Sequence, residues 1–133
     1  MSLSPEERSI IVHLEMEKAH SVYEQVQLGI DSNSWDLVAN RLYYAAFHAV
    51  SALLIHKGLQ VGSHKGAAMM FRQHCVLTGE FSQEESHHYA RLQQLREEGD
   101  YNCFIQTSEE EMRPFIPFVK DFIQKIEEYI TAH

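Results

Sequence analysis

The sequence has few of the residues that form cross-links or interrupt regular structure. Its 133 residues include two cysteines, three prolines and six glycines. Cys75 and Cys103 are far apart and lack metal-ligand spacing, which indicates two reduced thiols and no disulfide framework. The histidines form no H-E-x-x-H pattern, so we expect neither a metal nor another cofactor. A chain of this length buries roughly two-thirds of its unfolded surface, so residues 1–133 are predicted to form one domain without such cross-links.

Long apolar runs are also missing. No stretch reaches the roughly 20 apolar residues that a membrane-spanning helix needs. The N-terminal sequence MSLSPEERS lacks the basic segment followed by an apolar one that marks a secretion signal. These two absences predict a cytoplasmic protein that does not enter a membrane.

Positive charge is scarce, because 11 Lys and Arg face 19 Asp and Glu and give a net charge of -8. This balance argues against a broad nucleic-acid-binding surface. Residues 40–96 nevertheless carry six cations and three anions, together with six of the nine histidines. A local anion site on an acidic molecule is one interpretation. The other is that acidic outer helices simply keep the protein soluble.

Apolar residues recur with helical spacing throughout, and nothing alternates as a strand does. Ser4 with Glu7, Ser82 with Glu85 and Ser108 with Glu111 form three predicted capping boxes, and Gly58 and Gly79 are predicted helix stops. Pro114 and Pro117 should bend the last helix or shorten its front. The predicted fold is all-α, an antiparallel up-and-down bundle of about five helices, over residues 5–28, 34–56, 63–78, 82–98 and 108–131.

The second predicted helix is apolar in nearly every direction, except for one narrow polar stripe. Arg41 and His48 lie on this stripe within about 20° of each other and about 10 Å apart along the axis. One interpretation is a cleft in which Arg41 grips a phosphate and His48 transfers a proton. The alternative is that Arg41 pairs with a buried acid, Asp100 or Asp36, and that His48 bonds a backbone carbonyl.

Two other segments place polar groups that could face the same cleft. Ser63 caps a helix whose first residues, His64 and Lys65, favour an anion, although an ordinary capped helix is the alternative. Arg96 and Asp100 are four residues apart. Arg96 is either a second cation oriented by Asp100, or half of a salt bridge that closes the following loop with Tyr101 packed beneath.

Aromatic residues flank the polar stripe of the second predicted helix. Tyr43, Tyr44 and Phe47 could stack on nucleic-acid bases. Apolar positions of a central helix are more commonly core positions, and that alternative stays open.

Three segments, in this order, resemble the HEPN domain (higher eukaryotes and prokaryotes nucleotide-binding). They are Arg41–Ala49, which matches an R-x-Y-Y-A-x-F-H pattern, Gly62–Gly66, and Leu95–Tyr101 followed by a capped amphipathic helix. The resemblance implies a bundle of four main helices plus a shorter one, often dimeric. It also implies a partner, a minimal nucleotidyltransferase, in a pair that behaves as toxin and antitoxin.

Several HEPN domains are metal-independent ribonucleases whose active members carry an arginine and a histidine a few residues apart. Arg41 and His48, with six residues between them, fit that spacing. In active members this motif usually lies later in the chain, before the last helix. The corresponding segment here keeps an arginine, Arg96, but has Asp100 where a histidine is expected. An aspartate is a poor general acid at neutral pH.

The resemblance therefore implies Arg41 and His48 as catalytic residues of a possible endoribonuclease. For a nucleotide or RNA ligand we predict binding through Tyr44, His64, Lys65, Arg96 and Asp100. A non-catalytic module that binds a nucleotide or a partner, and a plain dimerisation domain, are the alternatives.

Overall fold

The computed structural model describes residues 3–101 and 106–133, and every regular element within them is a helix. This confirms the predicted all-α class. No helix in the described part of the chain is both long and apolar enough to cross a membrane. The elements are α1 (Pro5–Glu24), α2 (Val26–Asp31), α3 (Trp35–His56), α4 (His64–Phe71), the π-helix η1 (Arg72–Val76), α5 (Gln83–Tyr101), α6 (Glu109–Met112) and α7 (Phe115–Ala132).

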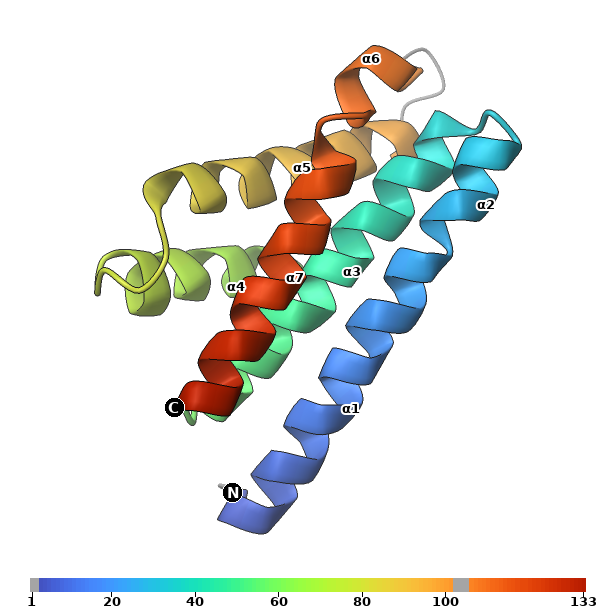
Figure 1. Ribbon diagram of the computed structural model, residues 1–133. Helices are drawn as coiled ribbons and strands as arrows, with labels where there is room; N and C mark the ends of the chain where they lie inside the picture. The colour runs from blue at the N-terminus through green and yellow to red at the C-terminus, as the bar shows by residue number, and fades with distance from the viewer. Residues whose placement is uncertain (1–2, 102–105) are drawn as a thin grey trace.

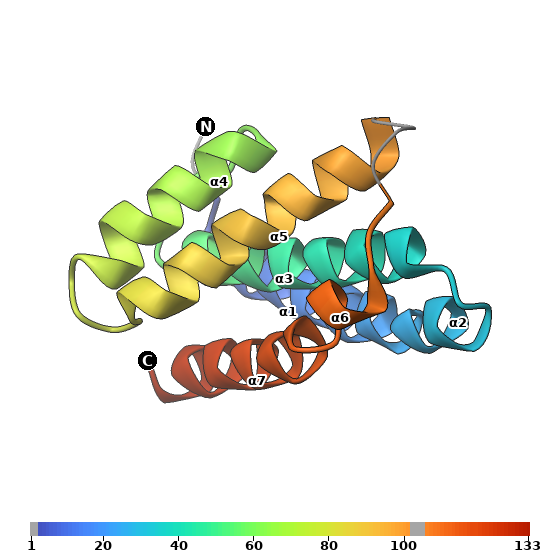
Figure 2. The same cartoon turned by 90° about the horizontal axis from the view of Figure 1, so that it is seen from above.

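Helix α3 lies at the centre of the bundle (Figures 1 and 2). Helices α1 and α7 run beside it, and α4 and α5 cross it on the other side. The four long helices α1, α3, α5 and α7 alternate in direction along the chain, as an up-and-down bundle requires (Figure 1). This arrangement follows from the side chains of α3, which are buried on nearly every side.

The core is built around α3, where small and large side chains alternate. Ala45, Ala46, Ala49 and Ala52 are fully buried, and they let neighbouring helices approach closely. The large side chains that fill the remaining space include Leu42, Tyr43, Leu53, Leu54, Phe71, Tyr89 and Phe122. Cys75 is buried as a free thiol, and burial raises its pKa to about 11. Cys103 lies outside the described residues.

Local signals set several helix ends where we predicted them. Ser4 and Glu7 form a complete capping box at the start of α1, and Ser82 and Glu85 exchange the same two bonds before α5. Ser108 accepts from the Glu111 N–H before α6, as the third predicted capping box requires. The side chain of Glu111 instead pairs with Arg91, at 3.0 Å.

The other helix boundaries differ from those predicted, apart from the expected effect of Pro114. The predicted helix over 5–28 is interrupted at Gln25, whose N–H bonds the Val22 carbonyl three residues back. The last predicted helix is divided before Pro114, because proline has no N–H with which to continue the helical ladder. Helix α5 continues past the predicted end at residue 98 and includes Asp100 and Tyr101, so these two residues are not loop.

Candidate functional site

Arg41 is bound by neutral side-chain amides. Its Nε and Nη2 donate to Asn40 Oδ1 at 2.9 and 2.6 Å, and its Nη1 donates to Gln25 Oε1 at 2.8 Å. The alternative of a buried acid partner is therefore wrong. Asp100 accepts from the Asn40 side chain instead, at 3.2 Å, and Asp36 accepts from the Thr107 N–H. Among the side chains that the structure describes, none neutralises the Arg41 guanidinium by an ion pair.

His48 is oriented by a carboxylate from another helix. Its Nδ1 lies 2.8 Å from Oε2 of Glu15 on α1, where a backbone carbonyl was the predicted alternative. A carboxylate only accepts hydrogen bonds, so Nδ1 is the donor in this contact, and a neutral imidazole held in this way has Nε2 as its acceptor. The two side chains are 21% and 29% exposed, so the imidazole is reachable from solvent.

His64, at the start of α4, packs against the aromatic residues of α3. Its Nδ1 and the Tyr43 hydroxyl are 2.9 Å apart, and its ring centre lies 4.3 Å from that of Phe47. Burial lowers the pKa of His64, and the positive charge of Arg96 lowers it further. Its imidazole is therefore neutral at neutral pH.

The aromatic residues beside the stripe belong mainly to the core. Tyr43 is fully buried, and burial raises its pKa to about 12. Tyr44 and Phe47 are half-buried and pack against the core cluster. The core interpretation is therefore the better one for all three.

Arg96 is the most buried charged residue in the site. Its side chain is buried against two tyrosine rings, with Cζ 5.0 Å from the centre of Tyr43 and 5.5 Å from that of Tyr44. Nη1 lies 3.6 Å from Oδ2 of Asp100 one turn later. This ion pair is formed within α5, so it does not close a loop. Tyr101 contacts the guanidinium, with its ring centre 5.9 Å from Arg96 Cζ, although the tyrosine itself is 79% exposed.

The residues that we predicted for the site come from three helices and gather on one side of α3. Arg41 and Arg96 both contact the Tyr44 ring, at 5.6 and 5.5 Å from its centre. We call the seven residues the α3–α4–α5 site: Arg41, Tyr44, His48, His64, Lys65, Arg96 and Asp100.

Part of this site borders an open depression of about 640 Å³ between the start of α4 and the end of α5. Lys65 and Arg96 are the two cations of its lining, and the imidazole of His64 lines it as well. Glu97 and Glu98 line it as well, so its walls differ in charge. We call this hollow the α4–α5 depression.

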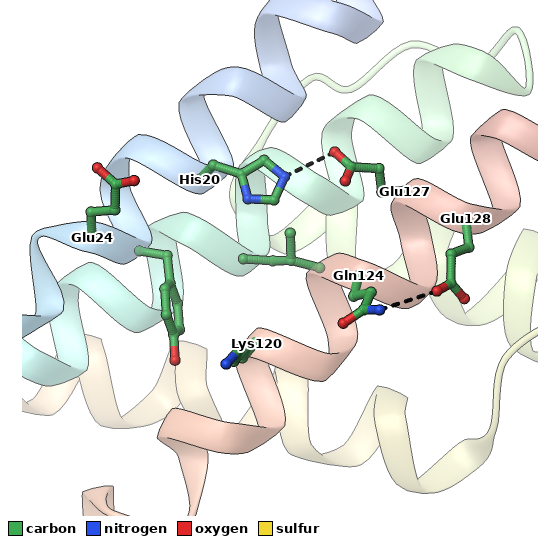
Figure 3. A pocket seen from close by; sticks show the side chains of 8 residues that line it. His20, Glu24, Lys120, Gln124, Glu127 and Glu128 are labelled. Carbon is green, nitrogen blue, oxygen red and sulfur yellow. Dashed lines mark hydrogen bonds and ion pairs between the residues drawn. The ribbon is translucent and has the colours of Figure 1, made fainter.

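A second pocket, of about 410 Å³, lies between α1 and α7 and contains none of the seven residues (Figure 3). His20 and Glu127 face each other across it, with Nε2 and Oε2 2.8 Å apart. Glu24 and Glu128 also line it, so its character is acidic. Within the described ranges, no group of three or more His, Cys, Asp or Glu side chains is placed to hold a metal.

Sequence reasoning missed two residues that hold the site, one within α1 and one directly after it. Glu15 orients His48, and Gln25 accepts from Arg41. Glu15 is one of several acids on an acidic helix, and Gln25 stands at a helix break. Nothing in their local sequence distinguishes either residue from its neighbours.

Comparison with known proteins gives consistent matches over most of the chain. The family model described as HEPN domain matches residues 12–129. A UPF0332 protein of Thermotoga maritima is 31% identical over 93% of this chain and 94% of its own length. Two proteins of Methanocaldococcus jannaschii named as candidate toxins are 27% and 33% identical. They cover 88% and 68% of this chain and 80% and 72% of their own lengths.

Proposed function

Because this chain belongs to the HEPN domain family, we propose that it is the toxin-type member of a toxin–antitoxin pair and that it cleaves RNA at the α3–α4–α5 site. The names of the two Methanocaldococcus jannaschii relatives support the toxin-type role. The two arginines and the oriented histidine of the site support RNA as the target.

The proposed chemistry needs no metal. His48 Nε2 would take the proton from a ribose 2′-hydroxyl, which then attacks the adjacent phosphorus and displaces the 5′-oxygen. The resulting imidazolium would return a proton to that departing oxygen. Arg41 and Arg96 would stabilise the negative charge that develops on the phosphoryl oxygens. The contact with Glu15 would stabilise the imidazolium, as a carboxylate does for a catalytic histidine.

One observation carries this proposal: Arg41 holds its guanidinium between two amides and has no ion pair within the described side chains. A half-buried arginine with a purely structural role would be expected to pair with an acid, because burying an uncompensated charge is unfavourable. An arginine held by amide oxygens keeps its full charge for an anionic ligand.

The test is cleavage of RNA in EDTA. The native protein should cut a single-stranded RNA, and His48→Ala should lower the rate by at least about 100-fold if His48 is the general base. His13→Ala is the matched control, since His13 is also paired with a glutamate but lies exposed on α1. If the native protein leaves RNA intact, the nuclease proposal is rejected; if both variants lose activity equally, His48 is rejected as the general base.

We further propose a homodimer and a minimal nucleotidyltransferase as antitoxin, as the family resemblance implies. Expression of this chain alone in a bacterial host should arrest growth, and His48→Ala should not. Co-expression of a nucleotidyltransferase encoded beside it should restore growth. Light scattering after gel filtration would give the mass of the assembly, and a mass near 15.4 kDa would reject the dimer.

A binding module without catalysis is the second candidate. The α4–α5 depression favours it, because acids stand there beside the basic residues and Asp100 occupies the late position where active family members place a histidine. This candidate predicts that RNA or a nucleotide binds in EDTA and stabilises the fold, while the RNA stays uncut.

A further inference from the structure

The two arginines of the α3–α4–α5 site are connected through one side-chain amide. Asn40 Oδ1 accepts from Nε and Nη2 of Arg41, at 2.9 and 2.6 Å, and Asn40 Nδ2 donates to Oδ2 of Asp100 at 3.2 Å. The same Asp100 oxygen lies 3.6 Å from Nη1 of Arg96. A continuous set of contacts therefore joins the Arg41 guanidinium on α3 to the Arg96 guanidinium on α5. We call Arg41, Asn40, Asp100 and Arg96 the arginine link.

The contacts of the link suit an amide at position 40. An amide oxygen accepts hydrogen bonds and an amide nitrogen donates them. A guanidinium only donates and a carboxylate only accepts, so the two neighbours fix the orientation of the Asn40 amide. A carboxylate in its place would face that of Asp100 at the 3.2 Å now spanned by a hydrogen bond, and an apolar side chain would make neither bond.

The amide also leaves the two arginines with different degrees of charge compensation. Arg96 lies 3.6 and 3.8 Å from carboxylate oxygens of Asp100 and Glu97. Arg41 is instead held by neutral amides, which bond three of its five N–H donors and leave two for a ligand. The link thus fixes the position of Arg41 without neutralising it.

The position of these two cations needs to be fixed because they share one aromatic ring. Arg41 Cζ and Arg96 Cζ lie 5.6 and 5.5 Å from the centre of the Tyr44 ring. Like charges near one another repel, and an unrestrained arginine side chain samples many rotamers. A displacement of about 1 Å in an active site can lower a rate about 100-fold. Loss of the link should therefore impair the site even where both arginines remain.

We propose that Asn40 is a positioning residue of the proposed ribonuclease: through Asp100 it holds Arg41 and Arg96 as one phosphate-binding unit. This inference rests on the proposed function and adds to it a residue that acts through other side chains. It predicts that Asn40 and Asp100 contribute to RNA binding jointly, so the effects of changing them are not additive.

A double-mutant cycle measures this joint contribution. The variants are Asn40→Asp, Asp100→Asn and both changes together, and the probe is a short 2′-O-methyl RNA, which cannot be cleaved through a 2′-hydroxyl. Its affinity in EDTA is measured by fluorescence anisotropy. Asn40→Asp places two carboxylates in contact and should weaken binding at least about 10-fold. The double variant restores an amide–carboxylate pair in reverse order. It should bind at least about 10-fold more tightly than the two separate effects together predict.

Gln124→Glu is the matched control. Gln124 on α7 donates to Glu128 at 3.2 Å, so this change also places two carboxylates in contact, in a pocket whose lining contains no residue of the link. It should leave the RNA affinity within about twofold of the native value, because distant exposed charges are screened. Thermal melts of the same variants identify a merely structural contact, which would lower the melting temperature and leave the affinity of the folded protein unchanged. Additive effects in the cycle, or equal losses in Asn40→Asp and Gln124→Glu, would overturn the proposal.

Failure of this inference is distinguishable from failure of the proposed function. If natural RNA is cleaved in EDTA but the cycle is additive, only the positioning role of Asn40 is rejected. If the cycle shows the joint contribution but natural RNA remains uncut, the link stands as part of a binding site and the nuclease is rejected. If the native protein binds no RNA, both are rejected.

Discussion

Glu15 and His48 join α1 to the central helix through one short contact, 2.8 Å between Oε2 and Nδ1. The two residues are 33 positions apart in the sequence. A carboxylate on Nδ1 selects the imidazole tautomer with a free Nε2 and stabilises the imidazolium once it forms. Orientation of the proposed general base therefore depends on the packing of α1 against α3.

Glu15→Gln should lower RNA cleavage by about 10- to 100-fold while RNA affinity stays nearly unchanged, since the amide stabilises the imidazolium less well. Single-turnover rates and binding curves on the same RNA separate the two effects. Glu17→Gln, which alters the exposed pair with His13, is the control and should cleave normally. Equal rates for Glu15→Gln and the native protein would remove Glu15 from the mechanism.

Neutralising Arg41 from within the fold should weaken RNA binding. Gln25 accepts from Arg41 at 2.8 Å, so Gln25→Glu places a carboxylate against the guanidinium. We expect RNA affinity to fall about 3- to 10-fold, with a small gain in thermal stability from the new ion pair. Gln73→Glu adds the same charge at an exposed position of η1 and controls for net charge. A similar loss in both variants would indicate only long-range repulsion.

Glu80 should make stability depend on pH in the acidic range. Burial by itself raises the pKa of Glu80, but hydrogen bonds from Lys57, Tyr129 and Thr78 outweigh burial and lower it from 4.5 to about 2. The carboxylate is thus more acidic in the folded state than in the unfolded state. Its stabilising contribution is complete above about pH 5 and is lost as the pH falls through 4.5 towards 2.

Glu80→Gln should therefore lower the free energy of unfolding by about 1–2 kcal/mol at pH 7, and the difference from the native protein should vanish near pH 2. Urea unfolding across this range measures it. Glu110→Gln, at an exposed position of α6, should give no such trend. A difference that stays constant with pH would mean that Glu80 does not contribute through its charge.

Removing the hydroxyl of Tyr89 and removing that of Tyr43 should change the stability of the fold in opposite directions. The Tyr89 hydroxyl is buried without a partner among the described residues, so Tyr89→Phe should be neutral or raise stability by up to about 1 kcal/mol. The Tyr43 hydroxyl is 2.9 Å from His64, and Tyr43→Phe should lower stability by about 1 kcal/mol. Thermal melts of the two variants test this pair. A loss of stability in Tyr89→Phe would show that its hydroxyl is bonded in solution.

Local chemistry was enough to predict much of the helical layout. Caps such as Ser4 with Glu7 and left-handed glycines such as Gly58 act over a few residues, and these signals can be recognised in any sequence. The interruption at Gln25 and the extension of α5 to Tyr101 depend on how neighbouring helices pack, which no short window contains. The same applies to the site, whose seven residues could be proposed but whose contacts could not.

The amino-acid sequence by itself established an all-α fold, because the period of apolar side chains and the caps are local properties of the chain. It also identified α3 as central, since a helix that is apolar on nearly every side must be surrounded. Only tertiary structure established that Arg41 faces amides while His48 faces a carboxylate. Glu15 approaches α3 from α1 and Gln25 from the residue directly after α1, and polar partners this far apart in the sequence are brought together by packing alone.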